Sequence, residues 1–157
     1  MKKKEIILLV GKSGSGKDYF VNTFNMKQIV THTTRPKRVT EKHGVDKWFH
    51  KTVYTQDAST FVAYTKRGKY HYWASIDDLY LGDIFIIDVP GVKTLINNKV
   101  SKKFFTFKVV YIECSLFKRI RNMLKRKESF RSIISRLRID HKDFKPIYDY
   151  NPIIVRV

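Results

Sequence analysis

The chain has 157 residues and a formal net charge of +18 at pH 7, from 32 Lys and Arg against 14 Asp and Glu. This length suits one compact domain, and the basic balance favours anionic partners such as phosphate-bearing ligands or nucleic acid. The single cysteine, Cys114, excludes an internal disulfide and a cysteine-rich zinc site, which favours a reducing, cytoplasmic setting.

The first apolar run of the chain predicts a buried strand. Residues 5–10 (EIILLV) end at Gly11, as expected of a strand in a parallel sheet. Its roughly five apolar residues are fewer than the 7–15 of a signal peptide, and no later apolar stretch approaches the roughly 20 residues of a membrane span. We therefore expect a protein without a membrane segment.

A glycine-rich loop follows this strand directly. Residues 11–18 (GKSGSGKD) match the pattern G-x-x-x-x-G-K, and an amphipathic helix is predicted from Lys17 to about Met26. Glycines let backbone N–H groups approach phosphates closely, and the lysine adds positive charge on the β- and γ-phosphates. The loop therefore predicts an ATP site formed by Ser13, Gly14, Ser15, Gly16, Lys17 and Asp18.

The eighth position of the loop departs from the usual pattern. A Ser or Thr hydroxyl normally holds Mg²⁺ on the nucleotide there, and this chain has Asp18. The substitution indicates either an altered metal ligand or a loop that no longer transfers phosphate. Because a carboxylate is a hard oxygen ligand that Mg²⁺ accepts, we predict Asp18 as the metal ligand.

The middle of the chain has a different pattern. Polar and aromatic residues dominate from 32 to about 75, with short alternating runs at 47–50, 61–65 and 69–74. The last two runs flank KRGK, a glycine-containing hairpin signal. We predict a small antiparallel insert that forms a lobe over the main sheet.

The remaining segments alternate between strands and helices. Ser75 is a predicted N-cap, Pro90 opens a helix, and Ser115 caps the first of two strongly basic helices. The predicted strands of the main sheet are 5–10, 28–31, 83–89, 105–113 and 152–157. This alternation after a glycine-rich loop predicts an α/β fold of the P-loop NTPase class, with a five-stranded parallel sheet flanked by helices.

A second cluster of candidate residues follows the strand at 28–31. Arg35 and Arg38 lie three apart on a proline-stiffened turn, so both guanidinium groups can converge on one phosphate, assisted by the hydroxyls of Thr31 and Thr34. Two arginines on a solvated loop are the alternative, and spacing alone leaves both open. Asp88 ends the strand at 83–89, where a P-loop enzyme carries an acidic residue that holds Mg²⁺ through water or meets the substrate.

The segment from 31 to 49 resembles the substrate-phosphate loop of guanylate kinases. In that family Ser-x-Thr-Thr-Arg-x-x-Arg is followed by Gly-Glu and then by Gly-x-x-Tyr-x-Phe, and the matches here are Thr31, Thr33, Thr34, Arg35, Arg38, Glu41, Gly44 and Phe49. The resemblance extends more weakly over nearly the whole chain. It places Tyr72 on a substrate-phosphate tyrosine, Asp88 on the acidic strand end, Arg136 on a lid arginine and Arg126 on the arginine before the lid.

This resemblance implies one guanylate kinase-like domain over residues 1–157. Its core would be 1–31 and 83–157, its NMP-binding insert about 32–75, and its short basic lid about 125–136. The implied activity is transfer of the γ-phosphate of Mg-ATP to GMP, dGMP or another (deoxy)nucleoside monophosphate. The implied catalytic residues are Lys17, Arg35, Arg126 and Arg136, and the implied acceptor contacts are Thr31, Thr34, Arg35, Arg38, Tyr72 and Asp88. Mg²⁺ is the implied cofactor, in a monomer or homodimer.

The departures from the family keep other interpretations open. Lys47 replaces the substrate-loop tyrosine, Ala63 replaces the guanine-reading glutamate, and Ala74 falls near the base-contacting serine. Loss of that carboxylate removes the main hydrogen-bond reason for guanine specificity. These changes are those of a divergent enzyme, and we expect a phage or similar mobile source.

Two alternatives to a monophosphate kinase remain. One is a non-catalytic guanylate kinase-like module that binds a phosphorylated ligand. The other is a polynucleotide 5′-hydroxyl kinase, which the charge of +18 suits. No clear aspartate base and no nucleic-acid-binding signature supports the second, so nucleic acid is a weighed but not a favoured partner.

Overall fold

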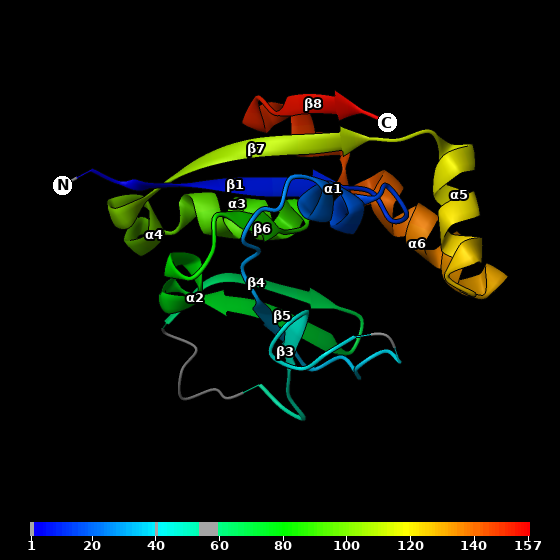
Figure 1. Cartoon of the computed structure of the whole chain (residues 1–157), viewed down its shortest axis with the longest axis horizontal. Coiled ribbons are helices and arrows are strands. Elements are labelled where there is room, and N and C mark those ends of the chain that lie inside the picture. Colours follow the sequence, from blue (N-terminus) through cyan, green and yellow to red (C-terminus); the bar gives the residue numbers. More distant parts are fainter. Residues whose placement is uncertain (1, 40, 54–59) are drawn as a thin grey trace.

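The computed structural model describes residues 2–39, 41–53 and 60–157, and this part of the chain contains two four-stranded sheets (Figure 1). The first sheet is parallel in the order β6-β1-β7-β8, with β1 Lys4–Gly11, β6 Ile84–Ile86, β7 Phe105–Glu113 and β8 Ile153–Arg156. The second has the order β3-β2-β5-β4, with β2 Thr31–Thr33, β3 Lys47–Phe49, β4 Phe61–Arg67 and β5 Tyr70–Ser75.

Strand β1 occupies the interior of the parallel sheet, which explains its apolar sequence. It pairs with β6 on one side and with β7 on the other, with Ile7 opposite both Ile84 and Lys108. A parallel strand covered on both faces must be apolar at successive positions. Leu8 packs in the larger core cluster with residues of α3 (Val89–Asn97), whereas Leu9 packs on the opposite face with Val21 of α1 (Lys17–Thr23).

Three of the remaining helices begin at a serine cap, and the sequence predicted two of these caps, Ser75 and Ser115. Ser75, Ser115 and Ser129 each accept a hydrogen bond from the backbone N–H three residues later, which satisfies a helical donor that has no partner within the helix. The helices are α2 Ile76–Tyr80, α4 Lys99–Phe104, α5 Leu116–Lys125, α6 Phe130–Asp143 and the 3-10 helix η2 Lys145–Tyr150. Helix α4 and η2 were not predicted.

The structure corrects the predicted five-stranded sheet to four strands in the described part of the chain. The segment expected as a strand at 28–31 makes only an isolated parallel bridge between Gln28 and Ile84. The carbonyl of Lys27 already accepts from the backbone N–H groups of Asp83 and Ile84, and the chain then leaves the sheet edge. Thr31 therefore begins β2 of the second sheet.

The second sheet is mixed, where the sequence predicted an antiparallel one. Strands β2 and β3 pair in parallel, whereas β2–β5 and β4–β5 are antiparallel. The KRGK hairpin is confirmed, and Gly68 takes the positive φ of 58° that its turn requires. Figure 1 shows this sheet beside the parallel sheet, with the carboxyl ends of β1 and β7 directed toward α1, α5 and α6. Among the described residues, no helix is both long and apolar enough to cross a membrane.

The packing of α3 gives a test of the core. Leu95 is fully buried, so Leu95→Ala should lower the free energy of unfolding by roughly 2–5 kcal/mol through lost burial and the cavity left behind. The same change at Leu124 in α5, which is 41% exposed, should cost less than about 1 kcal/mol. Urea denaturation of both variants checks this expectation, and equal losses would contradict the assigned core.

Candidate active site

The glycine-rich loop connects the carboxyl end of β1 to α1. Gly14 and Gly16 have φ values of 78° and 91°, which side chains other than glycine rarely adopt. A Cβ atom on Gly14 would lie 2.5 Å from the carbonyl oxygen of Arg119, so α5 approaches the loop backbone closely. The Lys17 ammonium donates to the carbonyls of Gly11 and Lys12 at 2.6 and 3.3 Å, and burial lowers its pKa to about 8.

A buried ion pair holds the loop from behind. The Arg119 guanidinium lies 2.6 Å from the Asp140 carboxylate, and both side chains are less than one tenth exposed. Arg119 Nε donates to the Ser13 carbonyl at 2.9 Å, and Asp140 accepts from the Ser13 N–H at 2.9 Å. Asn122 donates to the Gly14 carbonyl at 2.9 Å. Helices α5 and α6 thus fix the loop through contacts that the sequence analysis did not identify.

Of the two loop-region side chains Asp18 and Ser15, only that of Asp18 is accessible to a ligand. Asp18, in the first turn of α1, is 68% exposed at its side chain and lies 3.4 Å from Arg126. The buried hydroxyl of Ser15 has no hydrogen-bond partner among the described residues. Mg²⁺ at nucleotide sites is typically held by one or two carboxylates together with phosphate oxygens and water, so the exposed Asp18 carboxylate fits this cation.

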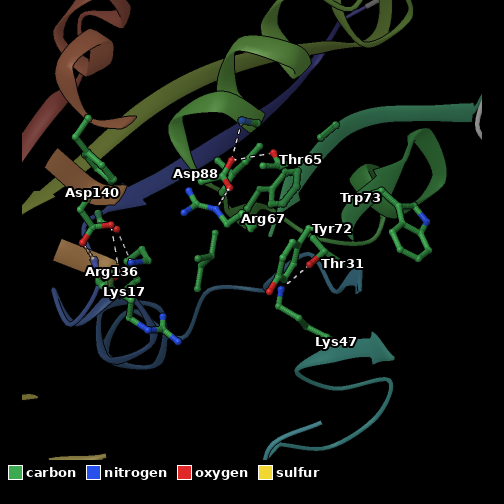
Figure 2. A pocket seen from close by; sticks show the side chains of 18 residues that line it. Lys17, Thr31, Lys47, Thr65, Arg67, Tyr72, Trp73, Asp88, Arg136 and Asp140 are labelled. Atoms are coloured by element: carbon green, nitrogen blue, oxygen red, sulfur yellow. Dashed lines mark hydrogen bonds and ion pairs between the residues drawn. The ribbon is translucent and has the colours of Figure 1, made fainter. Parts of the chain in front are cut away.

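A cleft of about 250 Å³ opens between the loop and the second sheet (Figure 2). It contains six of the predicted residues, namely Ser13, Lys17, Thr31, Tyr72, Asp88 and Arg136. Its cations are Lys17, Lys47, Arg67 and Arg136, and its carboxylates are Asp88 and Asp140. Apolar side chains complete the walls, including Trp73, Phe85 and Phe144. The arrangement suits an anionic ligand with an apolar portion. The other predicted residues lie around it and do not line it: Gly14, Ser15, Gly16, Asp18, Thr34, Arg35, Arg38 and Arg126.

The two arginines of the turn both lie beside the carboxylate of Glu41. Arg35 Nη2 contacts both carboxylate oxygens of Glu41 at 2.7 and 2.9 Å, and Arg38 Nη1 lies 3.7 Å away from the same carboxylate. Burial, followed by the positive charges of Arg35 and Arg136, lowers the pKa of Arg38. Thr34 has a structural contact instead, since its hydroxyl accepts from the His71 N–H at 2.9 Å.

Lys47, which stands where guanylate kinases have the substrate-loop tyrosine, lines the cleft. Its ammonium donates to the Thr31 hydroxyl at 2.6 Å, and Figure 2 shows both atoms beside the Tyr72 hydroxyl end of the ring. Burial, and then the charge of Arg35, lowers the pKa of Lys47 to about 8. A charged lysine held in this position has lost hydration that an incoming anion would replace.

Asp88 organises the opposite end of the cleft. Its Oδ1 atom accepts from the Gly91 N–H at 2.8 Å, which caps α3, and from the Thr65 hydroxyl at 3.0 Å. Its Oδ2 atom accepts from Arg67 Nε at 2.7 Å, and Arg67 Nη2 also lies 3.2 Å from Asp143. Thr65 and Arg67 were not predicted as site residues from the sequence. Their spacing of two and four residues from Ala63 could have indicated them, because alternate residues of a strand lie on the same face of the sheet.

The lid arginines take different positions. Arg136 of α6 lines the cleft and lies 2.9 Å from Glu128. Arg126, the C-cap residue of α5, contacts Asp18 across the mouth of the glycine-rich loop. Both predicted lid arginines therefore lie near the loop, but only Arg136 faces the cleft.

Replacing both Arg119 and Asp140 should lower the stability of the protein less than replacing Asp140 alone. Asp140→Ala leaves the Arg119 guanidinium buried without its partner and should cost roughly 3–5 kcal/mol of unfolding free energy. The double variant Arg119→Met/Asp140→Leu removes both charges and should recover at least half of that loss. Chemical denaturation checks both, and a double variant less stable than Asp140→Ala would refute this account.

The depressed pKa of Lys47 predicts a pH-dependent stability effect. The unfolded chain keeps the ordinary lysine pKa near 10.5, so between pH 8 and 10.5 it binds more protons than the folded chain, and stability rises with pH. Below pH 8 the full penalty of burying the charge is present. Lys47→Met should therefore stabilise the protein at pH 7 by on the order of 1 kcal/mol, allowing for partial solvation, and by less at pH 10. Thermal unfolding at both pH values checks this, with the exposed Lys66→Met as control.

Comparison with known proteins gives a fold but no sequence family. No protein-family model matches the chain, and no curated protein matches its sequence. Among solved structures, a guanylate kinase from Anaplasma phagocytophilum is similar with a TM-score of 0.62 and 16% identity, covering 99% of this chain and 78% of that chain. At this identity the similarity concerns the fold alone, so the chain has a guanylate kinase-like α/β fold with a four-stranded parallel sheet.

Proposed function

We propose that this protein is an ATP-dependent nucleoside monophosphate kinase that transfers the γ-phosphate of Mg-ATP to a nucleoside monophosphate. The observation that carries the proposal is the two-sided cleft, with Lys17 of the glycine-rich loop on one side and Lys47, Thr31 and Tyr72 on the other. A protein that joins two phosphate-bearing substrates needs cations on both sides of one cavity. The guanylate kinase-like fold supports the same assignment.

The donor side is the loop between β1 and α1. We assign the ATP phosphates to Lys17 and to the backbone N–H groups of Ser13, Gly14, Ser15 and Gly16, because such loops bind phosphates through successive amides. The N–H groups of Ser13 and Ser15, which donate to Asp140 and to the Lys12 carbonyl, would exchange these partners for phosphate oxygens. Asp18 would hold Mg²⁺, which would neutralise part of the negative charge of the phosphates. Its present contact with Arg126 would then be exchanged for the cation.

The acceptor side is the second sheet and its turn, corresponding to the insert at about 32–75. We assign the acceptor phosphate to Lys47, Tyr72 and Thr31, with Arg35 and Arg38 adjacent. Arg35 and Arg38 both pair with one carboxylate, that of Glu41, and Lys47 donates to the Thr31 hydroxyl. These three cations therefore have the excess positive charge that a dianionic phosphate needs.

The reaction then requires positioning more than proton transfer. An ionised oxygen of the acceptor phosphate attacks the γ-phosphorus, the bond to the bridging oxygen of ADP breaks, and no general base is needed. Lys17 and Arg136, which both line the cleft, would balance the charge of the moving phosphoryl group. Closure of the segment at about 125–136 would exclude water, which otherwise hydrolyses ATP.

A non-catalytic phosphate-binding module is the second candidate, favoured by two observations. Asp18 replaces the usual hydroxyl, and the Asp140 carboxylate already occupies the Ser13 N–H. Calorimetry separates the candidates. A kinase should bind ATP, lose that binding in Lys17→Ala and couple it to monophosphate binding. A module should bind the monophosphate without measurable ATP affinity.

The activity itself is tested with a coupled assay for ADP formation across all ribo- and deoxynucleoside monophosphates. We expect turnover with at least one acceptor, and Lys17→Ala should lower kcat at least about a hundredfold because a transition-state charge contact is lost. An absence of ADP formation over the whole panel, with either Mg²⁺ or Mn²⁺, would eliminate the kinase proposal.

The role of Asp18 is tested by three substitutions. Asp18→Ser should retain Mg²⁺-dependent turnover because a hydroxyl is also a metal ligand, whereas Asp18→Ala should lower kcat at least about tenfold and weaken the dependence on Mg²⁺. Asp77→Ala, also an exposed carboxylate in the first turn of a helix, is the matched control and should leave both unchanged. An Asp18→Ala enzyme with normal rate and normal Mg²⁺ dependence would rule out metal ligation.

A further inference from the structure

One wall of the cleft has polar side chains that the proposed phosphate contacts leave unassigned. Ala63, Thr65 and Arg67 alternate along β4 and all line the cleft, so they share one face of the second sheet. Thr65 is paired with Tyr72 across β4 and β5. Figure 2 shows Lys47, Thr31 and Tyr72 together at one end, with Thr65, Arg67 and Asp88 grouped beyond them.

Arg67 is held in one orientation by two carboxylates. Nε donates to Asp88 Oδ2 at 2.7 Å, and Nη2 lies 3.2 Å from Asp143. Among the described residues, Nη1 makes no hydrogen bond or ion pair of its own. A guanidinium fixed at two of its nitrogens presents the third as a donor in a set direction, without the entropy loss of ordering a free side chain.

The hydrogen-bond acceptors on this wall are largely occupied. Asp88 Oδ1 accepts from both Gly91 and Thr65, and Asp88 Oδ2 accepts from Arg67. Ala63 adds no polar atom to the same face. The free donor on this wall is therefore Arg67, whereas the Thr65 hydroxyl gives its hydrogen to Asp88 and can only accept from a ligand. A ligand group placed at Arg67 is recognised through its own acceptors.

Resting on the proposed function, we infer that Arg67 is the residue that reads the base of the acceptor nucleotide. A nucleotide with its phosphate at Lys47 and Tyr72 extends its nucleoside along the wall that Thr65 and Arg67 form. The guanidinium donates to a carbonyl oxygen and an adjacent ring nitrogen, as arginine does to O6 and N7 of guanine. The substrate class is therefore monophosphates of bases with a carbonyl group at this edge.

This geometry makes two distinctions. Adenine carries an N6 amino donor where guanine carries O6, so the Arg67 donor meets a donor and adenine binds more weakly. The 2-amino group of guanine lies away from the edge formed by O6 and N7, and Ala63 offers it no acceptor. Guanine and hypoxanthine nucleotides should therefore bind equally well, whereas a site that pairs the 2-amino group rejects hypoxanthine strongly.

The inference is tested by calorimetric binding of GMP, IMP and AMP, as ribo- and deoxynucleotides, in the absence of ATP. We expect GMP and IMP to differ in Kd by less than about threefold, and AMP to bind at least about tenfold more weakly than both. Equal binding of AMP and GMP, or IMP weaker than GMP by a hundredfold, would overturn the assignment to Arg67. Binding is measured without turnover, so the two proposals can fail separately. If GMP and IMP bind more tightly than AMP but no ADP forms, the kinase proposal is wrong and base reading by Arg67 still stands.

Variants of Arg67 provide the second arm. Arg67→Lys keeps a positive charge beside Asp88 and Asp143 but removes the planar set of guanidinium donors. The Kd values of GMP and IMP should therefore rise at least about tenfold, whereas the Kd of AMP should change less than about twofold. Lys66→Arg, the reverse exchange at the neighbouring exposed position, is the matched control and should change none of them. Equal weakening of all three nucleotides by Arg67→Lys would assign Arg67 to the sugar or phosphate and overturn base reading. Unfolding midpoints confirm that both variants are folded.

Discussion

The buried pair between Arg119 and Asp140 is the interaction on which the rest of the site depends. It joins α5 to α6, and both partners contact Ser13, so the two basic helices and the glycine-rich loop are one unit. Removing two charges from water carries a large desolvation cost, which their hydrogen bonds to the Ser13 backbone help to offset. The loop is thereby fixed before any ligand arrives, and its conformation is coupled to the helices that carry Arg126 and Arg136.

Several positive charges lie close together in the cleft, which opposes folding and favours the binding of an anion. Lys17 and Lys47 lose hydration on entering it, and burial lowers the pKa of both to about 8. Carboxylates relieve part of this repulsion, Asp88 beside Arg67 in the cleft and Glu41 beside Arg35 in the turn outside its lining. An anionic ligand would relieve more, so the arrangement exchanges stability of the empty protein for affinity.

Local sequence patterns predicted the elements well because each depends on near neighbours. The strand at β1, the hairpin at Gly68 and the caps at Ser75 and Ser115 follow from apolar runs, a glycine turn and hydroxyl acceptors. The prediction of a fifth strand was wrong for the opposite reason. An extended segment at 28–31 is compatible with a strand, but its pairing depends on Asp83 and Ile84, more than fifty residues later in the chain.

The sequence by itself determined the glycine-rich loop, the alternation of strands and helices, and the hairpin at Gly68, because each is encoded within a short segment. Only the tertiary structure brought Lys47 to Thr31, Arg67 to Asp88 and Ser13 to Asp140, pairs separated by 16, 21 and 127 residues. A lysine, an arginine or an aspartate on a basic surface gives no sign of such a partner. Burial turns these side chains into site residues, since a charge removed from water must lie beside another charge or a hydrogen-bond partner.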